Sequence, residues 1–242
     1  EKLMENCVFK DILGNEILLP YSDSTKRILN EYLTSGNNQI NFLQDIPELL
    51  NFLFEQRKDK KLNVLDIGAN GGLFSLYAAS VCENVFAIEP SSVLCNNIRL
   101  FAKEINNITV CNCAISNKEG MISYYFFPDC TGQSTIHNRA KAKNAEAIKL
   151  SVNAYTIESF AKKYKIDYID ICKVDIEGEE VNLFDDESIE RLEPLVDRFW
   201  IEVHHTAHIN GKLMQDNYKE ITSRFKKHGY NILEDIDHYG FI

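Results

Sequence analysis

An aspartate and a glycine-rich loop follow the first strongly apolar run of this chain. Asp66 lies near the end of the run 62–67, and three glycines then occur between positions 68 and 72. The G-x-G-x-x-G fingerprint of dinucleotide-binding loops is not met, because Asn70 and Leu73 stand where its second and third glycines belong. A carboxylate beside the loop would repel a phosphate and attract an ammonium group. The loop therefore suits a ligand with a positively charged amino end.

A second acidic residue, Glu89, follows the next apolar run, 84–88, about twenty residues after the loop. A carboxylate at this place can accept hydrogen bonds from both ribose hydroxyls of a nucleoside. The alternative is a charge at the N-terminus of the following helix. An amino-acid end near Asp66 and a ribose at Glu89 together describe S-adenosylmethionine, which we predict as the cofactor.

Two further stretches, KVDIEGEE and WIEVHH, place ionisable side chains at the ends of later strands. Carboxylates that end an apolar run are costly unless they are used or solvated. A histidine at a strand end in a cleft suits a general base, because its charge changes near neutral pH. The sequence does not decide which histidine acts. We predict catalytic residues from this group: Lys173, Asp175, Glu202, His204 and His205.

The same stretches leave two alternatives open. Glu179 and Glu180 are interpreted as charges on the first turn of a helix rather than as site residues. Asp175, Glu202 and a histidine also offer oxygen and nitrogen ligands for Mg²⁺ or a transition metal. A divalent metal is therefore an alternative that the sequence leaves open without favouring it.

The elements that must position these groups alternate along the chain from residue 61 onward. Apolar strands separated by helical stretches indicate an α/β fold with a mostly parallel sheet, doubly wound and covered on both faces. A preamble at 1–60, with a short strand or hairpin and two helices, precedes the main domain at 61–242. The strands are expected at 62–67, 84–89, 108–116, 168–176, 198–205 and 230–236, and the helices at 71–81, 91–105, 178–186 and 218–229.

One segment, 121–157, interrupts this alternation and is expected as strand, polar loop and strand. The loop, about 128–147, is long for a compact domain, and such loops are usually functional or mobile. It carries His137, Arg139, Lys141 and Lys143, which would clamp an anionic acceptor or form part of a lid. For the two lysines, a solvated and mobile loop is the favoured interpretation.

Composition restricts the class of protein. A formal net charge of -10 disfavours a nucleic-acid partner. The seven cysteines are scattered, and Cys111 and Cys113 are expected to be ordinary buried thiols. There is no apolar run of membrane-spanning length and no secretory signal pattern. We therefore expect a reduced, cytoplasmic protein.

Seven motifs, in order, resemble those of the FkbM-type methyltransferases, within the class I S-adenosylmethionine-dependent superfamily. They cover about residues 62–205. Glu158 stands where the family usually has Asp, and Glu179 where Ala is frequent. The stretches that carry the resemblance are DIGANGGLFSLYAA, AIEPSSVLCNNIRLF, CAISNKEG, GQSTI, YTIESF, CKVDIEGEE and WIEVHH.

The resemblance implies a Rossmann-like class I methyltransferase fold and O-methylation of a hydroxyl, usually on a sugar, glycan or glycosylated natural product. Polysaccharide biosynthesis is the setting that it favours. A nicotinamide-dependent oxidoreductase and a non-catalytic S-adenosylmethionine-binding module are the competing hypotheses. The residues expected to hold the cofactor are Asp66, Gly68, Asn70, Gly71, Glu89, Pro90, Ser91, Ala114 and Asp175.

Overall fold

The computed structural model describes the chain in several stretches. They are residues 6–10, 16–20, 62–79, 82–128, 131–136, 147–204, 214–236 and 239–241. Within these stretches, no helix is both long enough and apolar enough to cross a membrane.

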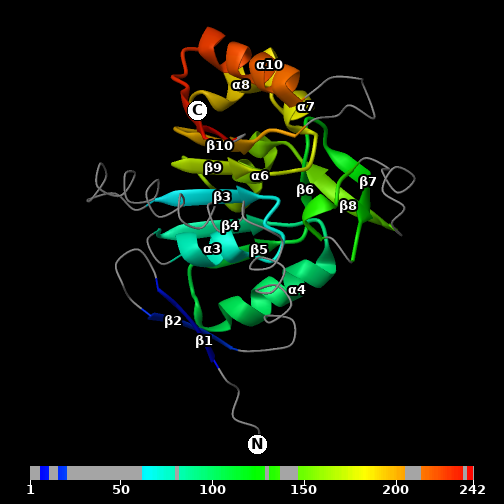
Figure 1. Cartoon of the computed structure of the whole chain (residues 1–242), viewed down its shortest axis with the longest axis vertical. Coiled ribbons are helices and arrows are strands. Elements are labelled where there is room, and N and C mark those ends of the chain that lie inside the picture. The colour runs from blue at the N-terminus through cyan, green and yellow to red at the C-terminus, as the bar shows by residue number, and fades with distance from the viewer. Residues whose placement is uncertain are drawn as a thin grey trace, which may run out of the picture.

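A seven-stranded sheet forms the centre of the described structure (Figure 1). Its strands run in the order β11-β12-β10-β9-β3-β4-β5. The five from β10 to β5 are parallel to one another, whereas β12 is antiparallel to both β10 and β11. The strand bounds are β3 Asn63–Ile67, β4 Asn84–Ile88, β5 Ile108–Cys111, β9 Ile171–Val174, β10 Phe199–Glu202, β11 Leu233–Ile236 and β12 Tyr239–Phe241.

Helices cover both faces of this sheet (Figure 1). On one face, Phe160 of α6 and Phe225 of α10 belong to the same buried cluster as Leu65 of β3. On the other face, Phe74 of α3 meets Trp200 edge to face, with ring centroids 5.4 Å apart. The predicted doubly wound α/β fold is therefore confirmed. The helices are α3 Leu73–Ala78, α4 Ser92–Phe101, η1 Ala102–Glu104, α6 Ile157–Tyr164, α7 Glu180–Leu183, α8 Asp186–Leu192 and α10 Met214–Lys227.

Local sequence signals explain where several helices begin. The side chains of Ser91, Thr156 and Asp185 accept hydrogen bonds from backbone N–H groups in the first turns of α4, α6 and α8. These side chains satisfy donors that the first turn of a helix otherwise leaves without a partner. Helix α8 begins three residues after α7, so the single short helix expected at 178–186 is in fact the start of a helical pair.

A second, three-stranded sheet stands beside the large one. Its order is β6-β8-β7, with β6 parallel and β7 antiparallel to β8. The expected single strand at 108–116 was wrong, because β5 ends at Cys111 and the chain then changes sheet at Asn112 and Cys113. The bounds are β6 Ala114–Ile115, β7 Gly120–Phe126 and β8 Ile148–Tyr155, and the short helix η2, Thr131–Gln133, follows β7.

The described part of the N-terminal region is a hairpin. Strands β1, Asn6–Lys10, and β2, Glu16–Pro20, pair antiparallel. The two helices expected before residue 61 lie outside the described residues. The division at residue 60 stays a prediction.

Candidate active site

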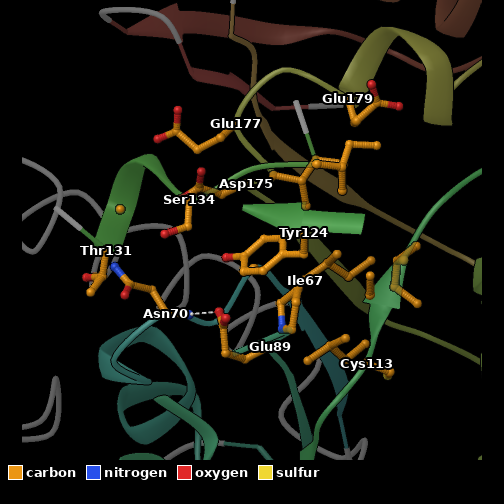
Figure 2. A pocket seen from close by; sticks show the side chains of 18 residues that line it. Ile67, Asn70, Glu89, Cys113, Tyr124, Thr131, Ser134, Asp175, Glu177 and Glu179 are labelled. Atoms are coloured by element: carbon orange, nitrogen blue, oxygen red, sulfur yellow. Dashed lines mark hydrogen bonds between the residues drawn. The ribbon is translucent and has the colours of Figure 1, made fainter. Parts of the chain in front are cut away.

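A pocket opens where β3, β4 and β9 end and the small sheet begins (Figure 2). Its volume is about 600 Å³, including the space at its open mouth. The large sheet contributes Ile67, Gly68, Ile88 and Asp175, and β7 and the segment after it contribute Tyr124 and Ser134, among others. Open α/β sheets bind their ligands at the carboxyl ends of the strands, and this pocket lies there.

The glycine loop is fixed by contact with the neighbouring strand ends. Gly68 has φ +82°, and a Cβ added to it would lie 1.8 Å from the carbonyl oxygen of Asp175. The N–H groups of Gly68 and Ala69 both donate to the carbonyl oxygen of Ile88, at 3.0 Å. The backbone therefore requires glycine at 68 for its conformation and for the close approach of β9.

The third glycine of the loop serves helix packing. Gly72 also has φ +82°, and a Cβ there would lie 2.8 Å from Cγ1 of Ile98 on α4. Gly71 is buried and does not line the pocket.

The carboxylate of Glu89 is held by two backbone groups. Its Oε2 accepts a hydrogen bond from the N–H of Asn70 at 2.9 Å (Figure 2). Its Oε1 accepts one from the N–H of Ser91 at 2.8 Å. Burial raises the pKa of Glu89 to about 7, against these two hydrogen bonds, which lower it. Each oxygen keeps a further lone pair for a ligand hydroxyl.

Asp66 lies behind the pocket rather than in its wall. The side chain is fully buried; Oδ2 accepts a hydrogen bond from the hydroxyl of Ser75 at 2.6 Å. Its Oδ1 lies 3.3 Å from Nζ of Lys173, which is also buried. The ammonium group that the sequence assigned to a ligand is thus supplied here by the protein itself.

The structure divides the predicted cofactor residues into two sets. Asp66, Gly71 and Ser91 stand outside the lining, where Ser91 caps α4 and supports Glu89. The residues that line the pocket are Gly68, Asn70, Glu89, Pro90, Ala114 and Asp175. Their binding of a cofactor stays a prediction.

Asp175 joins the pocket to a network of charges at the ends of β9 and β10. One of its oxygens, Oδ2, lies 3.6 Å from Nζ of Lys173. Burial and the nearby carboxylate of Glu202 raise the pKa of Asp175, against Lys173 and His204, which lower it. A carboxylate whose pKa is raised toward neutrality is a better proton acceptor.

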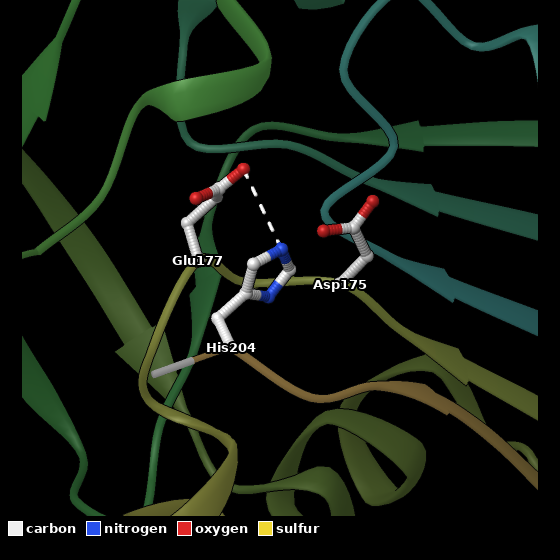
Figure 3. A group of neighbouring side chains, drawn as sticks. All are labelled: Asp175, Glu177 and His204. Atoms are coloured by element: carbon white, nitrogen blue, oxygen red, sulfur yellow. Dashed lines mark ion pairs between the residues drawn. The ribbon is translucent and has the colours of Figure 1, made fainter. Parts of the chain in front are cut away.

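His204 is surrounded by carboxylates (Figure 3). Its Nδ1 lies 3.0 Å from Oε1 of Glu180, and its Nε2 lies 3.4 Å from Glu202 and 3.7 Å from Glu177. Burial alone would lower the pKa of His204, but these three carboxylates outweigh burial and hold it well above its usual value. An imidazolium has no lone pair to accept a proton, so this arrangement does not suit the predicted general base.

Two other predicted catalytic side chains, Glu202 and Lys173, belong to the same network of charges. Glu202 faces His204, and Lys173 bridges Asp66 and Asp175. His205, like His208 and the loop residues His137 to Lys143, lies outside the described residues.

Three donor groups lie close enough for one cation. The ligand atoms of Asp175, Glu177 and His204 are all within 4.8 Å of one another. A protonated His204 already supplies positive charge to this group, and we identify none of the three as a metal ligand. The metal that the sequence left open stays an open prediction.

Sequence reasoning missed two groups that shape the site. Glu180, interpreted as a helix-end charge, is fully buried and contacts His204. Thr135, within the motif GQSTI, donates from its hydroxyl to the carbonyl oxygen of Glu177 at 3.0 Å. In the sequence, Glu180 is only a second glutamate after Gly178, which is a weak signal. Its importance becomes visible only from its contact with His204 in the folded chain.

Comparison with known proteins places the chain in a family. The model of the methyltransferase FkbM domain matches residues 66–232, more than half of the chain. The chain belongs to the FkbM methyltransferase family. The predicted resemblance to the FkbM-type methyltransferases is thereby confirmed as family membership.

One curated relative is the methyltransferase sdnD of Sordaria araneosa, 26% identical over 171 residues. The match covers 57% of this chain and 66% of that relative, so the chain spans slightly less than two thirds of its length.

Solved structures of methyltransferases are similar at low identity. The plantazolicin methyltransferase BpumL in complex with SAH is 12% identical, with a TM-score of 0.44 and coverage of 88% of this chain and 73% of that one. A SAM-dependent methyltransferase from Aquifex aeolicus is 12% identical, with a TM-score of 0.40 and coverage of 82% and 94%.

Proposed function

We propose that this chain transfers a methyl group from S-adenosylmethionine to a hydroxyl oxygen of a sugar, a glycan or a glycosylated natural product. The observation that carries the proposal is one pocket with two carboxylates in different roles. Glu89 is fixed by backbone N–H groups on one side, and Asp175 has a raised pKa on the other. Family membership gives the reaction class.

The residues present fit the proposed cofactor. Glu89 has acceptor capacity left for ribose hydroxyls, and its two oxygens are held in place. Apolar side chains line the pocket beside it, including Ile88, Cys113 and Ile115, and these suit a flat base. When bound, S-adenosylmethionine supplies a methyl group on a positively charged sulfur.

The chain's own contribution to the reaction is alignment and proton removal. Asp175 takes the proton of the acceptor hydroxyl, because it lines the pocket and its pKa is raised. Lys173 forms an ion pair with Asp175. The positive charge of His204 offsets the negative charges of Glu177 and Glu202. Neighbouring charges thus tune one carboxylate as the base.

The lining supports a neutral acceptor rich in hydroxyl groups. Among the described residues that line the pocket, acidic side chains occur, including Glu177 and Glu179, but no lysine or arginine does. Carboxylates accept hydrogen bonds from sugar hydroxyls and repel an anionic acceptor. The basic loop residues that would favour an anion lie outside the described structure.

The thiols support a proposal for the cellular setting. Five described cysteines are free and buried: Cys82, Cys95, Cys111, Cys113 and Cys172. Together with the negative net charge, they support a reduced, cytoplasmic protein that does not bind nucleic acid.

Calorimetric titration tests the cofactor half of the proposal. S-adenosylmethionine and S-adenosylhomocysteine should bind the purified chain, NAD⁺ should not, and Glu89→Ala should weaken binding at least tenfold. Binding of NAD⁺ alone would favour the oxidoreductase alternative and contradict the proposal.

Turnover tests the acceptor half. A methyl-labelled donor is offered with neutral sugars, uronic acids and amines, and the labelled product is identified by mass spectrometry. Asp175→Asn should lower the rate about 10²-fold or more, whereas the surface variant Asp186→Asn should not. Cofactor binding without turnover on any acceptor would favour the non-catalytic binding module.

A further inference from the structure

Glu180, the first residue of α7, is a fully buried carboxylate that does not line the pocket. Its Oε1 accepts hydrogen bonds from the N–H groups of Ile176 at 3.3 Å and Gly178 at 3.2 Å. Its Oε2 accepts from the N–H of Gly178 at 3.1 Å. One carboxylate therefore accepts hydrogen bonds from two backbone N–H groups, those of Ile176 and Gly178, in the loop that follows β9.

That loop has an unusual backbone. Glu177 has φ +57° and Gly178 has φ +111°, so two consecutive residues lie at positive φ. A glutamate in this region is uncommon and needs support from its surroundings. The loop supplies Asp175, Ile176, Glu177 and Glu179 to the pocket, so the carboxylate that supports the loop also shapes the pocket wall.

The same carboxylate contacts His204. Oε1 of Glu180 lies 3.0 Å from Nδ1, and an ionised carboxylate only accepts, so Nδ1 carries a proton. The backbone of His204 is held separately, because the side-chain amide of Asn217 donates to its carbonyl oxygen at 2.9 Å. With one ring nitrogen fixed, Nε2 faces Glu177 and Glu202.

We propose that Glu180 is a positioning residue of the methyl-transfer site: it holds the 175–179 loop and the ring of His204 in one arrangement. The role in methyl transfer rests on the proposed function, whereas the arrangement itself can be tested without it. Glu180 touches neither the pocket nor a reacting atom. It acts through the loop and through the charge and tautomer of His204.

The first test is an NMR spectrum of the histidine ring nitrogens in the full chain at pH 7, with the His204 signals assigned by their loss in His204→Gln. The groups facing this ring are Glu177, Glu180 and Glu202, with Asp175 nearby. In the unmodified chain both nitrogens should be protonated. In Glu180→Gln the amide oxygen still accepts from Nδ1, but one negative charge is lost, so protonation of Nε2 should fall.

The second test separates the loop from the ring. Glu180→Ala removes the acceptor of the Ile176 and Gly178 N–H groups, so affinity for S-adenosylhomocysteine should fall at least tenfold, whereas Glu180→Gln should change it less than threefold. The control is Glu187→Gln, an exposed glutamate paired with Arg191, which should change neither readout. If Glu180→Ala does not fold, Glu180→Gln and its spectrum carry the test.

The outcomes are distinct. Unchanged His204 signals in Glu180→Gln would overturn the proposal, as would equal affinities for S-adenosylhomocysteine in Glu180→Ala and the control. An unmodified chain that does not bind S-adenosylhomocysteine would contradict the proposed function, while the His204 spectrum would still decide the role of Glu180.

Discussion

The two sides of the pocket are built in different ways. On the β3–β4 side, Glu89 is held by backbone N–H groups, and Gly68 fits against backbone. On the β9–β10 side, Asp175 lies against Lys173 of its own strand, and His204 lies against Glu202 and against Glu180 from another segment. Backbone contacts do not titrate, whereas side-chain charges do. The partners on the first side therefore keep their charge at any pH, whereas the second side has an arrangement that depends on its charge balance.

The largest expected effect tests the β3–β4 side of the pocket. Gly68→Ala places a Cβ within 1.8 Å of a backbone oxygen, which neither strand can relieve by a rotamer change. We expect a loss of about 5 kcal/mol in the free energy of unfolding, or failure to fold. Denaturant unfolding measures it. Gly229→Ala is the matched control, with nearly the same φ, +84°, and open space around its Cβ; about 1 kcal/mol is expected. Equal losses in the two variants would show that close packing at Gly68 is unimportant.

The next effect tests the charged side. Lys173→Met leaves the fully buried carboxylate of Asp66 without its cation, which should cost about 4 kcal/mol. The double variant Asp66→Asn, Lys173→Met removes both charges and should recover more than half of that loss. Lys227→Met, which breaks the exposed pair with Asp186, should leave the free energy of unfolding nearly unchanged. A double variant no more stable than Lys173→Met would contradict this reading of the pair.

A third prediction concerns pH. The pKa of Glu89 is raised from its ordinary value of 4.5 to about 7 in the folded chain. Its contribution to stability is therefore complete below about pH 4.5 and is lost as the pH rises through 7. Between pH 5 and pH 8 the unmodified chain should lose about 3 kcal/mol more stability than Glu89→Gln. Parallel urea unfolding at the two pH values measures this difference; identical pH slopes would show that Glu89 is not desolvated in the folded state.

The smallest expected effect concerns the hydrogen bond between Thr135, after β7, and Glu177, after β9. Thr135→Val keeps the side-chain volume and removes the hydroxyl that donates to the carbonyl oxygen of Glu177. We expect a loss of about 1 kcal/mol in the free energy of unfolding. Affinity for S-adenosylhomocysteine, measured by calorimetry, should fall a few-fold, because the segment after β7 is then less firmly held against the pocket. Unchanged stability and affinity would show that this hydrogen bond supports neither the fold nor the pocket.

Much of the fold and part of the site could be predicted from sequence because they depend on local patterns. Apolar runs alternating with helical stretches defined the sheet, and Ser91 marked the start of α4. Glu89 and Gly68 were found from their spacing alone, and both line the pocket. Strand β5 was misjudged, because a change of sheet after Cys111 alters no local pattern.

By itself the sequence determined the fold class, the family motifs and the pocket's first side, because the periodicity of strands and helices and the conformation of the glycine loop follow from residues close together in the chain. Only the tertiary structure decided which charges meet. Lys173 takes the role at Asp66 that a ligand was expected to fill, and Glu180 holds His204 from 24 residues away. The physical reason is that an ionisable side chain takes its pKa and its partner from burial and neighbouring charge, and both arise only when distant segments pack together.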